Sequence, residues 1–349
     1  MPLLYRGELS HRVHARLNLL SLIRKLFATV FAGSFLLTAF AAWYVLTPLD
    51  AARYPAEFQI VSGSGLRAAA RQIEAGGVEL GRLRFELLAR ALGRSQEIKA
   101  GSYELAVAVT PLQLLEKLTR GDVTQAELAL IEGWTFRQVR AAIEAHPALR
   151  ADTRGLSDTE ILKRLEATEA HPEGLFFPDT YLFSKGTGDF DVLRRAYRAM
   201  QKQLQREWEA RDGALPYRTP YDALIMSSLI EKETGRAADR ELVSGALVNR
   251  LRIGMRLQVD PTVIYGLGAA YDGNLRKRDL LLDGPYNSYT RAGLPPTPIA
   301  MPGLAAVRAA LHPAKTQALY YVARGDGTSQ FSRTLDEHNR AVAKYQLKR

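Results

Sequence analysis

The sequence predicts an α+β protein in three parts: an N-terminal transmembrane helix, a small α+β module, and a larger, mostly helical domain with short strands. Three observations lead to this prediction. One stretch of 21 residues contains no charged side chain, strand-like and helix-like segments alternate through residues 57–128, and long helical patterns joined by Gly and Pro loops fill residues 129–349. With 349 residues, the chain is long enough for two or three compact units.

The uncharged stretch is residues 26–46, which is rich in Phe, Leu, Ala and Val. A helix of this length, rising 1.5 Å per residue, crosses a hydrocarbon core of about 30 Å. Trp43 and Tyr44 near its end suit the membrane–water boundary, and Pro48 follows as a stop. A cleaved signal peptide is the competing interpretation. The apolar region of a signal peptide is normally about 7–15 residues and ends in small residues. The stretch here is longer and ends in Trp43-Tyr-Val-Leu46, so an uncleaved anchor is favoured.

Charge predicts the topology of this anchor. Residues 1–25 carry five basic side chains and one acidic side chain, so the positive-inside rule places this segment in the cytoplasm. The rest of the chain is then extracytoplasmic, on a single-pass protein of the inner (plasma) membrane. The net charge of +10 fits an anionic cell-envelope polymer. Nucleic acid is disfavoured, because no basic stripe is interleaved with aromatic residues.

A linker with two prolines at residues 47–56 precedes the small module, residues 57–128. Within it the patterns predict two strands and three helices, in the order strand from Phe58, helices 66–76 and 83–92, strand 98–105, and a helix from Pro111 to Leu118 capped by Thr110. Its opening resembles the LysM-like module found beside wall-cleaving enzymes. A generic α+β spacer is the alternative.

The larger domain, residues 129–349, is predicted to be mostly helical. Its expected helices are 136–145, 158–169, 191–210, 221–234, 238–251 and 304–310.

The fourth of these helices is apolar and ends in two carboxylates, Glu231 and Glu233. Burial disfavours a charged carboxylate and raises its pKa, and cleavage of a glycosidic bond requires a protonated acid at the leaving oxygen. Glu233 shares its helix face with three apolar residues, whereas the face of Glu231 is more polar. We therefore expect Glu233 to be the acid, with Thr234 orienting it, and Glu231 to be a supporting acid or part of an ion-pair cluster.

Three downstream loops are dense in functional side chains. The loop after the fifth helix is expected to have a left-handed cap at Gly254 and then an extended run through Gln258 and Asp260, fixed by Pro261. The second loop, residues 285–290, combines hydrogen-bonding groups with two aromatic rings, a mixture that suits sugar rings and amides. The third, residues 293–303, has four prolines in eight positions, which fixes its backbone.

These segments together resemble the endolytic murein transglycosylases of the YceG-like family. The motifs that carry the resemblance are Glu231-Lys-Glu233-Thr234, the run from Asn249 to Gly266, Tyr286-Asn287-Ser-Tyr289-Thr290, Gly293-Leu-Pro-Pro-Thr-Pro-Ile299, Glu173-Gly-Leu-Phe-Phe-Pro-Asp-Thr-Tyr181, Leu311-His-Pro-Ala314, and Phe331 with Glu337-His-Asn339. The resemblance covers nearly the whole chain. It implies a mostly helical catalytic domain, Glu233 as the catalytic residue, and Glu231 and Thr234 as supporting residues. The implied substrate-binding residues are Gln258, Asp260, Tyr286, Asn287, Tyr289 and Thr290.

The implied reaction cleaves nascent glycan strands of peptidoglycan between N-acetylmuramic acid (MurNAc) and N-acetylglucosamine (GlcNAc), without water as the nucleophile. It leaves 1,6-anhydro-MurNAc ends and is expected to terminate strand elongation. Glycan strands are the implied partner, with peptidoglycan synthases as further candidates and no cofactor.

Two alternatives stay open at this point. An ordinary peptidoglycan hydrolase would use Asp260 as a second carboxylate beside Glu233. A non-catalytic adaptor would bind glycan and recruit a synthase. A metal site is not expected, because the six histidines have no ligand spacing. The chain also lacks cysteine, which excludes disulfides and thiolate chemistry.

Overall fold

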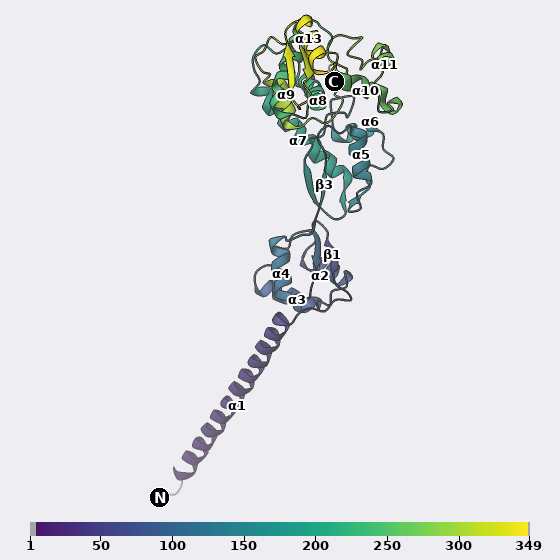
Figure 1. Cartoon of the computed structure of the whole chain (residues 1–349). Coiled ribbons are helices and arrows are strands. Elements are labelled where there is room, and N and C mark those ends of the chain that lie inside the picture. Colours follow the sequence, from purple (N-terminus) through teal and green to yellow (C-terminus); the bar gives the residue numbers. More distant parts are fainter. Residues whose placement is uncertain (1–4, 348–349) are drawn as a thin grey trace. The chain divides into compact units, whose positions relative to one another are not determined.

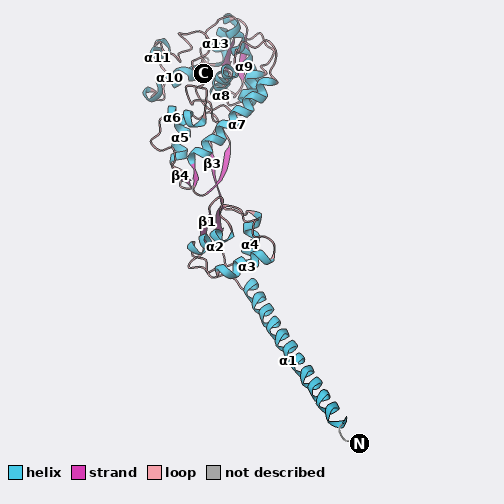
Figure 2. Ribbon diagram, turned by 180° about the vertical axis from the view of Figure 1, so that it is seen from behind, coloured by secondary structure: helices cyan, strands magenta, loops and turns pink. Residues whose placement is uncertain are grey.

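The computed structural model describes residues 5–347, with side chains from residue 24 onward. The chain divides into two compact units, Met1–Gln125 and Ala126–Arg349. The boundary predicted between residues 128 and 129 falls inside strand β3 (Gln125–Ala129). Residues 1–4 of the predicted cytoplasmic segment lie outside the described residues. Helices and short strands occur in both units, as the predicted mixed class requires (Figures 1 and 2).

The first unit begins with the long helix α1 (Tyr5–Leu46). Its Arg24–Leu46 part is long and apolar enough to cross a membrane, with a mean hydropathy of 1.8 and no part of the window buried. It is the single such helix among the described residues. The predicted span, residues 26–46, lies inside it, and the helix extends further because the basic segment before the span is also helical.

The rest of the first unit is a small α+β module. Its elements are β1 (Ala56–Ile60), α2 (Leu66–Ala75), α3 (Arg82–Ala91), β2 (Gly101–Leu105) and α4 (Pro111–Arg120). β1 and β2 pair antiparallel, with Ala56 opposite Leu105. Alternate residues of β1 are buried, so one face of this ribbon packs on the helices, and Phe58 stacks on Tyr103 at 5.6 Å. The likeness to a LysM module stays a prediction.

Local sequence explains where α4 starts. Thr110 accepts a hydrogen bond from the Gln113 amide, and the Gln113 side chain accepts from the Thr110 amide, which is a capping box. Pro111 takes the first helical position, where a missing N–H has no consequence. This start is the one predicted.

The second unit opens with short strands and two helices. These elements are β3, α5 (Phe136–Glu144), β4 (Leu149–Arg150), α6 (Asp158–Leu165), β5 (Thr180–Ser184) and β6 (Thr187–Gly188). β3 pairs with β5, and β4 with β6. The prediction that α6 reaches residue 169 was wrong. The helix ends at Leu165 because Glu166 adopts a left-handed conformation, φ 57°.

Four helices form the core of the second unit: α7 (Asp189–Glu209), α8 (Pro220–Glu233), α9 (Ala237–Arg252) and α12 (Leu304–Leu311). α8 packs most extensively on α12 and also contacts α7, α9 and α10 (Asp260–Leu267), so its apolar residues are surrounded. The remaining elements are the short helices η1 (Gly268–Ala270) and α11 (Lys277–Leu281), the hairpin β7 (Tyr320–Ala323) and β8 (Ser329–Ser332), and α13 (Leu335–Tyr345).

One expected conformation in this unit was wrong. Pro261 does not fix an extended run, because it lies in the first turn of α10, where its lack of an N–H is tolerated. Asp260 is therefore the first residue of a helix. Gly254 does adopt the left-handed conformation expected of it, with φ 69°.

Candidate active site

The acidic end of α8 is delivered by a helix with a well-defined start and stop. Thr219 and Asp222 form a capping box, and Pro220 occupies the first turn. The helix ends at Glu233, after which Thr234 is extended at φ −143°. The sequence therefore places both carboxylates in the last turn.

Burial around α8 is more complete than predicted. Every residue from 223 to 230 is buried. The apolar face that Glu233 shares is confirmed, since its residues are inaccessible to solvent. The serines on the face of Glu231 are equally inaccessible, because Ser227 and Ser228 donate their hydroxyls to backbone carbonyls at 2.6 and 2.7 Å. Both faces of α8 are therefore buried, and the two acids also differ in their partners.

Glu233 lies among groups that act on its charge in opposite directions. Its pKa is raised, above all because burial removes water from the carboxylate, and the negative charge of Asp260 adds to the increase. A hydrogen bond from Tyr321 and the positive charge of Arg250 oppose that increase. The balance favours a carboxyl group that retains its proton to higher pH than an exposed glutamate does.

Arg250 holds this arrangement together from α9. Its side chain is only 6 % exposed, and its guanidinium donates to the carbonyls of Leu319, at 2.6 Å, and Leu257. It also lies 5.8 Å from the centre of the Tyr321 ring. The strand β7 and the segment before α10 are thus tied to one buried cation next to Glu233.

Asp260 lies at the start of α10 and accepts a hydrogen bond from the hydroxyl of Tyr289. Burial and the neighbouring Asp260 carboxylate both raise the pKa of Tyr289, so its hydroxyl stays protonated. The structure brings Glu233, Asp260 and Tyr289 into one electrostatic cluster, since the Glu233 charge also acts on Tyr289.

Gln258 is exposed and has an unusual backbone, with φ 50°. Its N–H donates to the Ser288 carbonyl at 3.1 Å, and the Ser288 hydroxyl accepts from the Val259 N–H at 2.9 Å. The Thr262 and Ser288 hydroxyls are 2.8 Å apart. These bonds join the segment before α10 to the loop 285–290 and hold Gln258 at a site where its amide is open to solvent.

Asn287 is buried, and its amide is committed to the loop. Its Nδ2 donates to the carbonyls of Asp279, Leu280 and Leu282, and its Oδ1 accepts from the Tyr289 N–H at 2.8 Å. With 4 % of its surface exposed, this residue shapes the loop. A direct contact between Asn287 and a sugar stays a prediction.

Two further predicted binding residues also have partners within the protein. The Tyr286 hydroxyl is 2.9 Å from that of Thr297, and the ring of Tyr286 meets that of Tyr265 edge-on at 4.9 Å. The Thr290 hydroxyl donates to Asp283 at 2.8 Å and helps to hold the rim of the loop.

Glu231 has a different environment from Glu233. Its carboxylate accepts the Gly303 N–H at 2.9 Å, at the start of α12. Burial raises its pKa, while the Gly303 hydrogen bond and the charge of Arg240 oppose this. The Thr234 hydroxyl accepts the Arg236 N–H at 3.1 Å and so holds the turn into α9. An orienting role of Thr234 toward Glu233 stays a prediction.

A cleft of about 1090 Å³ opens in the same unit. Its wall includes Lys232 from the end of α8, Pro261 from α10 and Tyr286 from the loop, so it borders the three segments that carry the predicted site residues. Its volume is slightly above the range for small-molecule sites, about 300–1,000 Å³, which suits an extended ligand.

Glu173 lies in the wall of this cleft and is only 3 % exposed. It accepts the Phe136 N–H at 2.8 Å and the Tyr265 hydroxyl at 2.9 Å. Burial raises the pKa of Glu173 to about 7, because the loss of hydration outweighs these two hydrogen bonds.

Sequence reasoning did not single out Glu173, Arg250 or Tyr321 as site residues. Glu173 and Arg250 lie within motifs that carried the family resemblance, but nothing in their spacing indicated burial. Tyr321 is on a four-residue strand, which is too short for a clear alternation.

Comparison with known proteins matches most of the chain to one family. A protein-family model, described as the YceG-like family, matches residues 58–344. A Bacillus subtilis protein named endolytic murein transglycosylase is 34 % identical over 306 residues, which is 82 % of this chain and 83 % of that protein. One of the same name from Streptococcus pneumoniae is 26 % identical over 86 % of this chain, and the match spans 60 % of that longer protein.

A solved structure gives the same result. The crystal structure of a YceG-like protein from Listeria monocytogenes superimposes with a TM-score of 0.52 at 30 % sequence identity, covering 81 % of this chain and 97 % of that one. A family match over most of the chain, together with a relative above 30 % identity, establishes the relationship. This chain belongs to the YceG-like family.

Proposed function

We propose that this protein is an endolytic lytic transglycosylase, a carbon–oxygen lyase, that cleaves the MurNAc–GlcNAc bonds of peptidoglycan and leaves 1,6-anhydro-MurNAc ends. The observation that carries the proposal is the environment of Glu233: a desolvated carboxyl group with a raised pKa, at the end of a buried helix, facing Tyr321, Arg250 and Asp260. The name shared by the Bacillus and Streptococcus relatives supports the substrate class.

In the proposed reaction Glu233 acts first as an acid. Its proton passes to the bridging oxygen as the bond from that oxygen to MurNAc C1 breaks, and positive charge develops at C1. Glu233, now ionised, accepts the proton of the MurNAc 6-hydroxyl, whose oxygen then bonds to C1. The carboxyl group ends the cycle protonated, so no water is consumed.

The neighbours of Glu233 suit both halves of this cycle. Burial and the charge of Asp260 favour the protonated form at the start. When the carboxylate forms, the Tyr321 hydroxyl and the Arg250 guanidinium stabilise it. A raised pKa suits a carboxyl group that must first give and then take a proton.

The glycan strand is proposed to lie along the cleft, whose wall includes Tyr286 and Lys232, the residue next to Glu233. Tyr286 offers a ring for a sugar face, and the exposed Gln258 amide offers a donor and an acceptor for an acetamido or hydroxyl group. Asp260, Tyr289, Thr290 and Asn287 shape the rim of this site.

The proposed setting is the inner (plasma) membrane. α1 would cross it once with the N-terminus in the cytoplasm, so that the catalytic unit meets nascent glycan outside. Release of the strand there would terminate its elongation. The small module is the proposed LysM-like contact to glycan, and a peptidoglycan synthase is a candidate partner.

Asp260 keeps a hydrolase as the second candidate, because it is a carboxylate close enough to act on the charge of Glu233. Digestion of peptidoglycan in water labelled with ¹⁸O separates the two. The proposal predicts anhydro ends with no ¹⁸O, identified by mass spectrometry. Reducing ends carrying ¹⁸O would establish hydrolysis instead, and an absence of products from protein that binds glycan would establish an adaptor.

A further inference from the structure

The outer face of α3 carries apolar side chains that are exposed among the described residues. Leu83 and Leu87, one helical turn apart, are 69 % and 56 % exposed. The opposite face is the structural one, since Phe85 and Ala89 are fully buried in the core of the module. Two exposed leucines on one face of a helix mark a surface that suits an apolar partner.

α3 is held against the last two turns of α1. The Tyr44 hydroxyl donates to the Leu80 carbonyl at 2.8 Å, just before α3 begins. The Arg84 guanidinium lies 5.7 Å from the centre of the Phe40 ring and 5.8 Å from that of Tyr44. Figures 1 and 2 show α3 beside this end of α1 in opposite views.

These contacts define the depth of α3 relative to the apolar span. The span ends at Leu46. Phe40 and Tyr44 precede that end by about 9 Å and about 3 Å along the helix, at 1.5 Å per residue. A hydrocarbon core of about 30 Å takes up roughly twenty residues of the span. If α1 crosses the membrane as proposed, the start of α3 is level with the membrane–water boundary on the extracytoplasmic side.

The charges of this helix fit the same location. The segment 82–94 contains four arginines and one glutamate. The glutamate, Glu86, is buried and paired with Arg67 and Arg90, at 3.3 and 2.9 Å. A basic helix with leucines on an outer face is the pattern of helices that lie in the headgroup region, where anionic lipids attract arginine.

We infer that α3 is a membrane-surface helix, in which Leu83 and Leu87 insert into the boundary between headgroups and acyl chains. Arg84 and Arg94 contact lipid phosphates, since Arg82 is paired with Glu74 at 2.8 Å and Arg90 with Glu86. The small module then rests on the membrane instead of only being tethered to it. This inference depends on the proposal that α1 crosses the membrane, and the experiment below tests the two separately.

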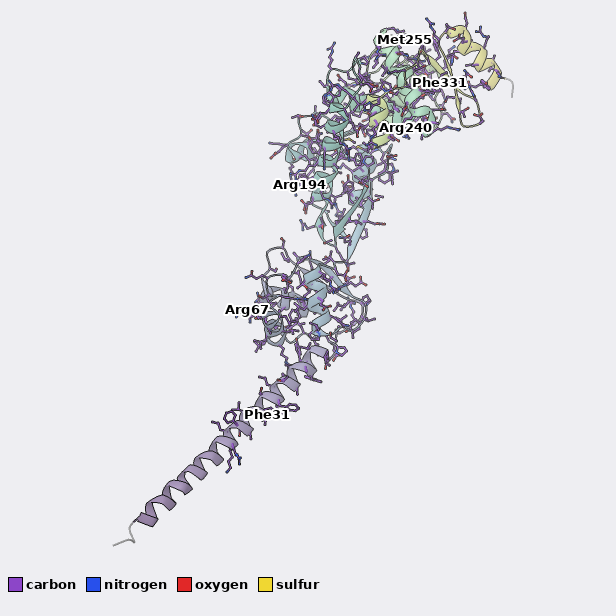
Figure 3. The ribbon with its side chains drawn as sticks, turned by 90° about the vertical axis from the view of Figure 1, so that its left-hand side faces the viewer. Phe31, Arg67, Arg194, Arg240, Met255 and Phe331 are labelled. Carbon is purple, nitrogen blue, oxygen red and sulfur yellow. The ribbon has the colours of Figure 1, made fainter. Side chains whose placement is uncertain are left out.

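Site-directed labelling tests this inference. The sequence contains no cysteine, so each introduced cysteine is the single labelling site. The full-length variants Leu83→Cys, Leu87→Cys, Phe31→Cys and Leu281→Cys are labelled with an environment-sensitive dye and reconstituted into phosphatidylcholine–phosphatidylglycerol vesicles. All four positions are exposed, so the replacements leave the core intact. Phe31, labelled on α1 in Figure 3, reports the anchor, and Leu281 in α11 is the exposed control in the other unit. Quenching is measured with lipids spin-labelled near the headgroup or deep in the acyl chain.

The expected result is deep quenching at position 31, shallow quenching with a blue-shifted emission at 83 and 87, and neither effect at 281. Quenching at 31 with positions 83 and 87 behaving like 281 would overturn the inference and leave the anchor intact. A blue shift at 83 and 87 without lipid quenching would also overturn it, because a protein contact would then cover the face. Failure of quenching at 31 would refute the anchor and the inference together.

Discussion

Glu173 is the buried carboxyl group for which the structure makes the most quantitative prediction. The pKa of Glu173 is about 7 in the folded protein, against 4.5 as the ordinary value. Between these two pH values the folded state holds a proton that the unfolded state has lost, so stability falls as pH rises through this window. Each difference of one in pKa corresponds to about 1.4 kcal/mol, so the full loss above pH 7 is about 3 kcal/mol.

Replacing Glu173 with Gln removes this loss of stability at high pH. The amide oxygen can accept the Phe136 N–H, and the amide nitrogen can donate to the Tyr265 hydroxyl oxygen, so the neutral side chain reproduces the protonated acid. We expect Glu173→Gln to gain about 2–3 kcal/mol relative to wild type on going from pH 5 to pH 8. Urea unfolding of the full chain, followed by tryptophan fluorescence, measures this, because Trp134 and Trp208 both belong to the second unit.

A matched control has the opposite sign. Glu160 is exposed, and hydrogen bonds from Ser157 lower its pKa, so its charge stabilises the fold at neutral pH. Glu160→Gln is expected to be less stable than wild type at pH 8, with the gap narrowing as pH falls below the ordinary value. Parallel pH dependences for Glu173→Gln and wild type would refute the reasoning about burial at Glu173.

Three further predictions concern the site. Tyr321→Phe removes a hydrogen bond that lowers the pKa of Glu233, so the alkaline limb of the pH–rate profile should move to higher pH. Asp260→Asn removes a charge that raises the pKa of Glu233, so the alkaline limb of the pH–rate profile should move to lower pH while anhydro products persist. Reducing ends, or a complete loss of products, would assign Asp260 a direct chemical role. Asn287→Ala leaves three carbonyls of the neighbouring segment without their donor, which should lower the free energy of unfolding by about 1–3 kcal/mol. Urea denaturation measures this change, and an unchanged midpoint would show that the loop does not depend on the Asn287 amide.

The sequence predicted best what depends on local pattern. The caps at Thr110 and the apolar run of α8 each follow from residues within a few positions of one another, and both helices start close to the predicted residues. The membrane span likewise depends only on a continuous apolar stretch.

Long-range pairing and burial could not be predicted in the same way. The sequence did not indicate that the more polar face of α8 is buried. Ser228 can be buried because its hydroxyl donates within the helix and also accepts the Ile299 N–H. Tyr321 meets Glu233 only because the chain returns from a distant hairpin. The sequence alone does not predict α10, because a proline such as Pro261 is compatible both with an extended run and with the first turn of a helix.

In the proposed reaction Glu233, and not Glu231, carries the proton that passes to the bridging oxygen. The most direct measurement is the rate of formation of anhydro ends by full-length wild type, Glu233→Gln and Glu231→Gln on the same peptidoglycan. We expect Glu233→Gln to abolish product while keeping the wild-type fold, because the amide cannot serve as the acid. Glu231→Gln should retain activity, since its amide oxygen can still accept the Gly303 N–H. Loss of product in Glu231→Gln with activity retained in Glu233→Gln would show that Glu231, and not Glu233, carries the proton.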